Sequence, residues 1–205
     1  MAGTLRQVPR LVAPLLTLAV LTAGCGGSSS PRATTPPPAA PGAAAPMPGA
    51  LPVPAGAQEA VVVSVSDGDT VRLRGRGVGP VPSGSTRVRL LLIDTPEVFG
   101  HTDCYGPEAS ARTKQLLPPG THVRVQGDTE ARDRYGRLLL HVWAPDGVSV
   151  GERLVSEGYA RLLQIDPNRR YLDVFRGEQA QARSAGRGLW AACGPAVGTR
   201  RSAPP

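Results

Sequence analysis

The chain has 205 residues, a formal net charge of +7, and many glycines and prolines, 25 and 22 respectively. Three of its 23 Lys and Arg residues lie in residues 1–57, which contain no Asp or Glu, so the remainder holds 20 basic against 16 acidic side chains. This modest excess permits a polyanionic partner without requiring one, and the sequence lacks the P-loop, the dinucleotide-binding fingerprint and the serine nucleophile elbow that mark three large enzyme classes.

The N-terminus has the layout of an export signal. Arg6 and Arg10 precede an apolar run at residues 11–21, which is too short for a membrane-spanning helix of about 20 residues. Small residues lead into Cys25, as in bacterial lipoprotein signals, where the cysteine becomes the lipidated N-terminus. We therefore predict a lipoprotein signal peptide over residues 1–24 and lipidation at Cys25. The alternative is an ordinary secretory signal with an incidental cysteine.

Residues 25–57 are predicted to form a disordered linker. They are mainly Ser, Pro, Ala and Gly with almost no charge, so they cannot bury enough apolar surface to offset the entropy lost on ordering. A proline-rich tether of this length reaches on the order of 100 Å. It would hold a domain at residues 58–196 away from a membrane surface, and residues 197–205 are expected to be a disordered tail.

Two cysteines, Cys104 and Cys193, remain once Cys25 is assigned to lipid. An even pair in an exported domain favours a disulfide. Closing a loop of about 90 residues would stabilise the fold by roughly 4–5 kcal/mol in the chain-entropy model. The alternative is a pair of buried free thiols.

Five segments of the predicted domain have the composition of β-strands. The first two meet at an Asp-Gly turn signal at residues 67–68. The third ends before Pro96, and a polar turn at residues 127–136 separates the last two. The predicted strands are residues 59–66, 69–74, 86–93, 121–126 and 137–143.

Helices are predicted at residues 106–117, 150–158 and 171–185. The first has Pro107 and Glu108 in its first turn and is followed by Pro118 and Pro119. Five short strands with about three helices predict an α+β domain on a small Greek-key barrel, the OB-fold, which usually binds oligonucleotides or oligosaccharides. Because a fold alone does not assign function, the site residues must.

Carboxylates and arginines gather in three segments. Carboxylate oxygens suit a hard cation such as Ca²⁺, arginines suit phosphate, and a free carboxylate can deprotonate water, which together meet the needs of phosphodiester hydrolysis. Each segment alone has a plainer explanation as a hairpin turn, a helix start or a solvated turn. The segments are Asp67-Gly68-Asp69-Thr70, Arg89 with Asp94-Thr95-Pro96-Glu97, and Asp133-Arg134-Tyr135-Gly136-Arg137.

In order and spacing, these segments resemble the staphylococcal nuclease (thermonuclease) family. The match covers roughly residues 60–190 and extends to Tyr105-Gly-Pro-Glu-Ala-Ser110 and Leu189-Trp190. The resemblance implies a Ca²⁺-dependent nuclease that cleaves DNA and RNA to 3′-phosphate ends. It also implies that the carboxylates of Asp69 and Asp94 and the backbone carbonyl of Thr95 bind Ca²⁺.

The same resemblance implies the remaining site roles. Glu97 would be the general base that acts on the attacking water. Arg89 and Arg137 would hold the scissile phosphate and stabilise the transition state. Tyr135 would contact a terminal phosphate, and the basic position before it is Arg134 in place of Lys.

Two departures from the family pattern stand out. The family's second site tyrosine aligns with Leu163, which removes a contact to base or phosphate. The loop at residues 98–104 is shorter and ends in Cys104, so a disulfide to Cys193 would pin this loop to the C-terminal end of the domain.

A geometric conflict arises in the third strand. Strict alternation puts Arg89 on one face with Leu91 and Ile93, and Asp94 on the opposite face. Both can reach one phosphate only if the strand bends or bulges between them, so we predict such a distortion. None of the three histidines has zinc-ligand spacing, and His141 is expected to be structural.

The sequence therefore predicts a monomeric Ca²⁺-dependent nuclease that acts on DNA or RNA and needs no protein partner. It is expected to be exported and anchored by lipid on the extracytoplasmic side of a bacterial cell membrane, with extracellular release as a further destination. The alternative is a non-catalytic OB-fold lipoprotein that binds nucleic acid or protein. A purely structural lipoprotein leaves the site residues unexplained.

Overall fold

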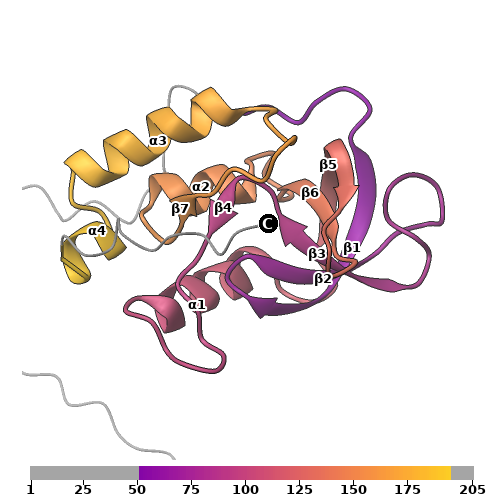
Figure 1. The fold of residues 1–205 in the computed structure, drawn as a ribbon. Helices are drawn as coiled ribbons and strands as arrows, with labels where there is room; N and C mark the ends of the chain where they lie inside the picture. Colours follow the sequence, from indigo (N-terminus) through magenta and orange to yellow (C-terminus); the bar gives the residue numbers. More distant parts are fainter. Residues whose placement is uncertain (1–50, 195–205) are drawn as a thin grey trace, which may run out of the picture. The chain divides into compact units, whose positions relative to one another are not determined.

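A computed structural model describes residues 51–194 of the chain (Figure 1). The predicted signal peptide, Cys25, the linker up to residue 50 and the predicted tail lie outside the described residues. Between residues 51 and 194, every helix is too short or too polar to cross a membrane.

Five strands of the described region close into a barrel in the order β1-β2-β3-β6-β5. Neighbours are antiparallel except β3 and β6, which run parallel and so make the barrel mixed. This confirms the predicted α+β domain with a five-stranded barrel. The strands are β1 (Gln58–Asp67), β2 (Thr70–Arg74), β3 (Ser85–Leu90), β5 (His122–Arg132) and β6 (Leu138–Trp143).

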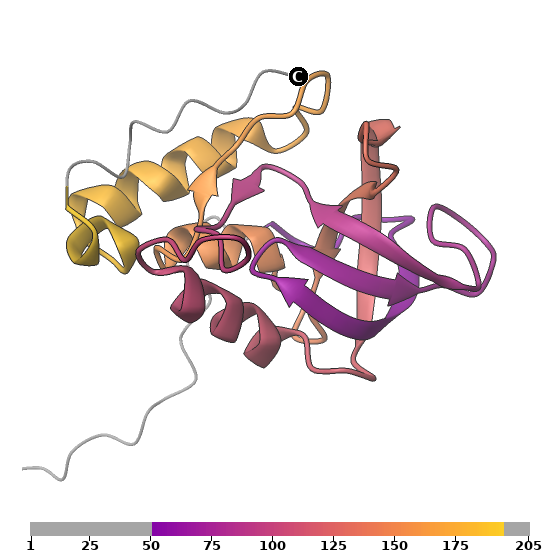
Figure 2. The same ribbon diagram turned by 60° about the horizontal axis from the view of Figure 1, so that its bottom comes forward.

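Four helices of the described region lie to one side of the barrel in both views (Figures 1 and 2). They are α1 (Gly106–Leu116), α2 (Val150–Ser156), α3 (Leu172–Ser184) and α4 (Leu189–Ala192). Helix α2 contacts α1, α3 and β6, and all six residues of β6 are buried. Strand β6 is therefore covered on both faces, by the barrel interior and by helices.

The predicted third strand is broken where the geometric conflict requires it. Strand β3 ends at Leu90, Leu92 has a positive φ of 62°, and Ile93 begins a separate strand. This strand, β4 (Ile93–Asp94), leaves the barrel and pairs with β7 (Arg161–Leu162). The predicted distortion is thus present, and a residue in left-handed conformation produces it.

Two further boundaries differ from the sequence prediction by more than two residues. Strand β5 continues through the predicted polar turn to Arg132, because Gly127 and Arg132 pair with Leu140 and Leu138 of β6 around an irregular stretch. At the other end, composition predicts a linker position for Leu51, but the side chain is buried in the core. Its N–H donates to Glu152 Oε2 at 2.8 Å, and its carbonyl oxygen accepts from Trp143 Nε1 at 3.1 Å.

His141 of β6 lies in a buried aromatic cluster. Its ring centroid is 5.0 Å from that of Tyr171, 6.2 Å from that of Trp143 and 6.3 Å from that of Phe175. Burial lowers the pKa of His141 to about 4, since the charged ring loses its hydration. His141 is therefore a neutral member of the core at neutral pH.

Candidate active site

The bend after β3 brings Arg89 and Asp94 together. Arg89 Nη2 donates to the carbonyl oxygen of Ile93 and to Asp94 Oδ1, both at 3.0 Å, and Nη1 forms an ion pair with Asp69. A regular strand would point Arg89 and Asp94 to opposite faces. The distortion at Leu92 therefore joins three of the predicted site residues.

Arg89 is a buried cation, with its side chain 7% exposed. Burial lowers the pKa of Arg89, the Asp94 carboxylate counteracts this, and the charge of Arg137 lowers it slightly further. An arginine stays protonated despite such a shift. Its guanidinium is fixed between Asp69 and Asp94, so it needs little reorganisation to receive an anion.

Asp69 is held by the turn between β1 and β2. Its Oδ1 accepts from the hydroxyl of Thr70 at 3.0 Å, and its Oδ2 accepts from the backbone N–H of Thr95 at 3.2 Å. A Cβ at Gly68 would lie 2.6 Å from Thr95 Oγ1, so only glycine lets the turn approach this closely. The Gly68 carbonyl oxygen in turn accepts from Thr113 of α1 at 2.7 Å. The turn is thus locked between α1 and the segment after β4.

Glu97 is exposed on the surface, and Asp67 lies beside it. No role for Asp67 is predicted from the sequence. Partial burial raises the pKa of Glu97, and a hydrogen bond and charge repulsion from the Asp67 carboxyl raise it further, while Arg89 opposes the rise. Two carboxyl groups in contact share a proton or face a cation. The sequence signal for Asp67 was its place in the Asp-Gly-Asp turn.

Arg137 immediately precedes β6, and Asp133 fixes the orientation of its side chain. Asp133 Oδ1 accepts from the N–H groups of Tyr135 and Arg137 at 3.0 and 2.9 Å, and Asp133 Oδ2 accepts from Arg137 Nε at 2.6 Å. Arg137 Nη1 then reaches Thr70 Oγ1 across the barrel edge at 3.4 Å. Asp133 is therefore a positioning residue, a role that the sequence motif did not reveal.

Arg134 and Tyr135 border the site at the tip of the β5–β6 turn. Tyr135 is 65% exposed, and the Arg134 guanidinium lies 4.9 Å from its ring centroid and donates to its hydroxyl at 2.9 Å. Leu163, at the family's tyrosine position, donates its N–H to the Leu92 carbonyl oxygen at 3.1 Å. Its backbone thus supports the bend, while its side chain offers no polar group.

A basic surface continues from Arg89 along the outside of the barrel. Between Asp69 and Asp94 the sequence has five arginines and no acidic residue. Arg72 and Arg87 are cross-strand partners, are both exposed, and lie two residues from the partners Thr70 and Arg89. Since alternate residues share a face, Arg72 and Arg87 lie on the same side of β2 and β3 as Arg89.

The predicted Ca²⁺ ligands are oxygen donors only, which is the chemistry that this ion prefers. Asp69 and Asp94 lie on the two sides of the Arg89 guanidinium, and the Asp67–Glu97 carboxyl pair adds negative charge nearby. Within residues 51–194, no group of three or more His, Cys, Asp or Glu side chains is arranged to hold a metal ion alone. The residues fit a hard cation that takes few ligands from the protein and the rest from water or phosphate.

The predicted disulfide is present and joins Cys104, before α1, to Cys193, after α4. These residues are 89 positions apart in the sequence, and their Cα atoms lie 5.8 Å apart. The disulfide lies outside the cluster of carboxylates and arginines. However, the loop that precedes Cys104 begins directly after Glu97.

Several endonucleases are similar to this chain. Endonuclease YncB of Bacillus subtilis (strain 168) is 38% identical over 132 residues, 62% of this chain and 59% of that protein. The SPbeta prophage-derived endonuclease YokF of the same organism is 38% identical over 128 residues, 60% of this chain and 41% of that protein. This chain thus matches less than two thirds of the length of either relative.

A thermonuclease from Staphylococcus hyicus is 35% identical over 132 residues, 63% of this chain and 73% of that protein. The family model described as "Staphylococcal nuclease homologue" matches residues 87–192, more than half of the chain. This range includes Arg89, Asp94, Glu97 and Arg137, and Asp69 precedes it. The chain belongs to the staphylococcal nuclease homologue family.

Proposed function

We propose that this chain is a Ca²⁺-dependent nuclease that hydrolyses phosphodiester bonds of DNA or RNA and leaves 3′-phosphate ends. The observation that carries the proposal is the Arg89 guanidinium, which is fixed between Asp69 and Asp94 with Glu97 and Arg137 in its electrostatic environment. Membership of the family and the endonuclease relatives support the same activity.

The two arginines bind the scissile phosphate. Each guanidinium offers a planar fork of N–H donors that matches phosphate oxygens. Arg89 is fixed by the Ile93 carbonyl oxygen and by two carboxylates, and Arg137 by Asp133. Donors fixed in advance stabilise the negative charge that develops on the phosphoryl oxygens at the transition state.

Glu97 activates the water. Its raised pKa makes the carboxylate a stronger base than an ordinary glutamate. The carboxylate takes a proton from water as the water oxygen bonds to phosphorus. The bond from phosphorus to the 5′-oxygen breaks, Arg137 stabilises the negative charge on the departing oxygen, and this oxygen takes a proton from solvent, so the products are a 3′-phosphate and a 5′-hydroxyl.

Ca²⁺ would be held by Asp69, Asp94 and the Thr95 carbonyl. When bound, the ion would supply charge neutralisation at the phosphate. The basic surface at Arg72 and Arg87 supports a polymeric substrate, because exposed arginines beside the site attract further phosphates. Arg134 and Tyr135, at the other border of the site, would contact the substrate.

We also propose that the enzyme is an exported monomer with a lipid anchor at Cys25, located on the extracytoplasmic side of the cell membrane or released from it. The disulfide supports export, because such bonds persist in oxidising compartments. Mass spectrometry of the N-terminal peptide tests the anchor: an acyl mass on Cys25 supports it, and an unmodified Cys25 contradicts it.

The activity is tested by digestion of DNA and RNA in Ca²⁺ and in chelator, with wild type and Glu97→Gln. We expect Ca²⁺-dependent cleavage that falls about 10²–10⁴-fold in the variant. Undiminished cleavage in chelator contradicts the metal dependence, and an unaffected variant contradicts the role of Glu97. Binding of nucleic acid without cleavage in any divalent metal supports the non-catalytic OB-fold alternative instead.

A further inference from the structure

The loop between Glu97 and α1 has few apolar contacts to hold it. Phe99 is 66% exposed, the His101 side chain is 63% exposed, and residues 99–102 are all exposed. Hydrophobic packing therefore does not fix the path of this loop. Its polar contacts and its disulfide must do so.

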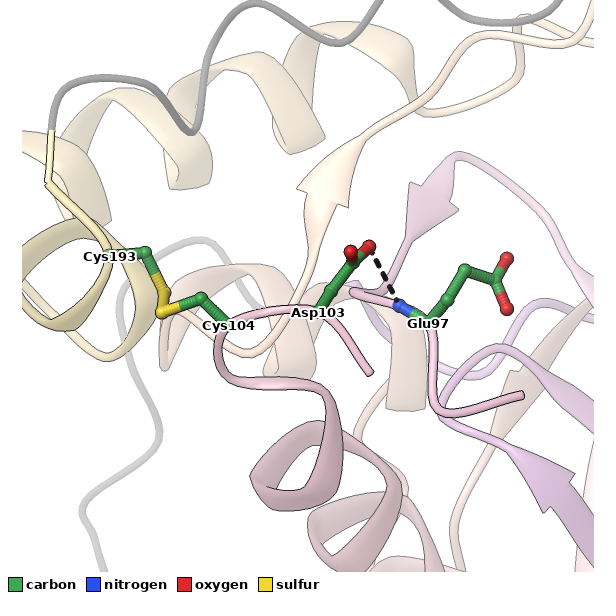
Figure 3. The surroundings of a disulfide bond; sticks show 4 residues. All are labelled: Glu97, Asp103, Cys104 and Cys193. Carbon is green, nitrogen blue, oxygen red and sulfur yellow. Dashed lines mark hydrogen bonds between the residues drawn. A yellow bond between two sulfur atoms is a disulfide. The ribbon is translucent and has the colours of Figure 1, made fainter. Parts of the chain in front are cut away.

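Asp103 contacts both backbone groups of Glu97. Asp103 Oδ2 accepts from the Glu97 N–H at 3.3 Å, and the Asp103 N–H donates to the Glu97 carbonyl oxygen at 2.9 Å. Figure 3 shows the Asp103 carboxylate turned toward this N–H, while the Glu97 side chain points away from it. Asp103 thus closes the loop through the Glu97 backbone and does not contact the Glu97 carboxyl.

The residue after Asp103 is the disulfide partner Cys104. Cys193 follows α4, whose Leu189 is fully buried and donates its N–H to the Gly158 carbonyl oxygen at 2.9 Å. The disulfide therefore ties Asp103 to a helix that is docked on the core (Figure 3).

The start of α1 also contacts both ends of the loop, Glu97 and Asp103. The Gly106 N–H donates to the Asp103 carbonyl oxygen at 3.1 Å. A Cβ at Gly106 would lie 2.5 Å from the Glu97 carbonyl oxygen, so helix and loop are in direct contact. Movement of Asp103 would therefore be transmitted to Glu97.

We infer that Asp103 is a positioning residue for Glu97 and that the Cys104–Cys193 disulfide keeps it in place, so that full activity requires the oxidised protein. The inference rests on the proposed role of Glu97. A dithiol reductant supplies two electrons and two protons to the disulfide, which becomes two thiols while the dithiol becomes a cyclic disulfide. The loop then loses its anchor, and the hydrogen bonds of Asp103 to Glu97 become transient.

The first test is steady-state cleavage of DNA by Asp103→Ala, Asp103→Asn and the control Asp173→Ala, whose carboxyl is exposed on α3. We expect kcat to fall about tenfold or more in Asp103→Ala with KM little changed, because misplacement of a catalytic group by about 1 Å costs up to 10²-fold. Asp103→Asn keeps an acceptor oxygen and should recover most of the loss. In a Glu97→Gln background, Asp103→Ala should cost little more, because Asp103 acts through Glu97.

The second test uses redox state. Dithiothreitol should lower kcat of the folded wild type, and reoxidation should restore it. A Cys104→Ser and Cys193→Ser double variant should have the reduced kcat from the start and should not respond to dithiothreitol. Circular dichroism verifies that each sample remains folded.

Amide hydrogen exchange at Glu97 gives a readout that does not depend on activity. Exchange should accelerate in Asp103→Ala and on reduction, and it should stay slow in Asp173→Ala. Two outcomes overturn the inference alone, provided that the wild type cleaves normally. In the first, Asp103→Ala has the kcat of the wild type. In the second, Asp103→Ala lowers kcat by the same factor in the Glu97→Gln background as in the wild type. A wild type that cleaves nothing overturns the proposed function instead.

Discussion

Arg89 donates a hydrogen bond from its guanidinium to the carbonyl oxygen of Ile93, four residues later in the chain, at 3.0 Å. This contact spans the bend at Leu92 and ties the arginine to the strand that carries Asp94. The bend and the site are therefore one structural unit. A substitution in the bend should disturb the site, and a substitution of Arg89 should disturb the bend.

Replacement of Arg89 by lysine should lower kcat about 10²–10³-fold, the usual cost of losing a preorganised donor. Lysine keeps the charge but cannot contact Asp69, Asp94 and the Ile93 carbonyl oxygen in one plane. Steady-state kinetics on a defined oligonucleotide measures the effect. Arg153→Lys, at a partly exposed ion pair with Asp146, is the control and should keep full activity.

Asp133→Asn should lower kcat by about tenfold or more, because the carboxylate that aims Arg137 loses its charge and one acceptor. The matched control is Asp146→Asn. Asp146 also accepts from a turn N–H, that of Val148, and from an arginine, Arg153, but it lies in the turn before α2. Equal kinetics in the two variants would contradict a positioning role for Asp133.

Arg72→Ser with Arg87→Ser should weaken binding of long single-stranded DNA more than binding of a dinucleotide. The exposed pair lies beside Arg89 on the same face, where only a longer strand can reach it. Each lost phosphate contact should also reduce the slope of log K against log salt by about 0.7. Arg176→Ser with Arg183→Ser on α3 is the charge-matched control. An unchanged salt slope in the Arg72 and Arg87 variant means that this surface does not contact the substrate.

Gly68→Ala should destabilise the fold by about 1–3 kcal/mol, since the new methyl group would overlap Thr95. Gly84→Ala, where a Cβ meets nothing within 4 Å, should stay within about 0.5 kcal/mol of wild type. Urea unfolding monitored by circular dichroism compares the two. Equal stabilities would show that the turn between β1 and β2 can move away from Thr95.

His141 makes stability depend on pH in a defined window. Its folded pKa is about 4 and its unfolded value about 6.5, so the unfolded chain binds more protons between these values. The stabilisation is present above pH 6.5 and is lost as the pH falls toward 4. It amounts to on the order of 3 kcal/mol at most. In His141→Phe this part of the slope should vanish, and in the exposed control His122→Gln it should remain.

The site residues that could be predicted belong to short motifs, whose residue types indicate their chemistry without a structure. Asp69, Arg89, Asp94 and Glu97 lie in such segments, and a distortion between Arg89 and Asp94 follows from strand alternation, although its position at Leu92 does not. The Cys104–Cys193 disulfide follows from an even cysteine count in an exported domain. These inferences need only the local geometry of a strand or an even number of cysteines.

The contacts that escaped prediction join distant parts of the chain. The proximity of Asp67 to Glu97 and the two contacts of Asp103 with Glu97 depend on the path of a loop, which no periodicity encodes. The extension of β5 to Arg132 depends on its pairing with β6. Leu51 sits in a proline-rich context, and only its burial against β6 and α2 reveals that it is structural.

Leu51 also determines which elements of the domain would bear a force applied to the N-terminal part of the chain. Its backbone is held by Glu152 of α2 and by Trp143 of β6, both buried. A pull transmitted along the chain from residues before Leu51 is therefore resisted by α2 and the end of β6. Asp94 and Glu97 lie outside α2 and β6, and Arg89 meets β6 only as the cross-strand partner of Leu139.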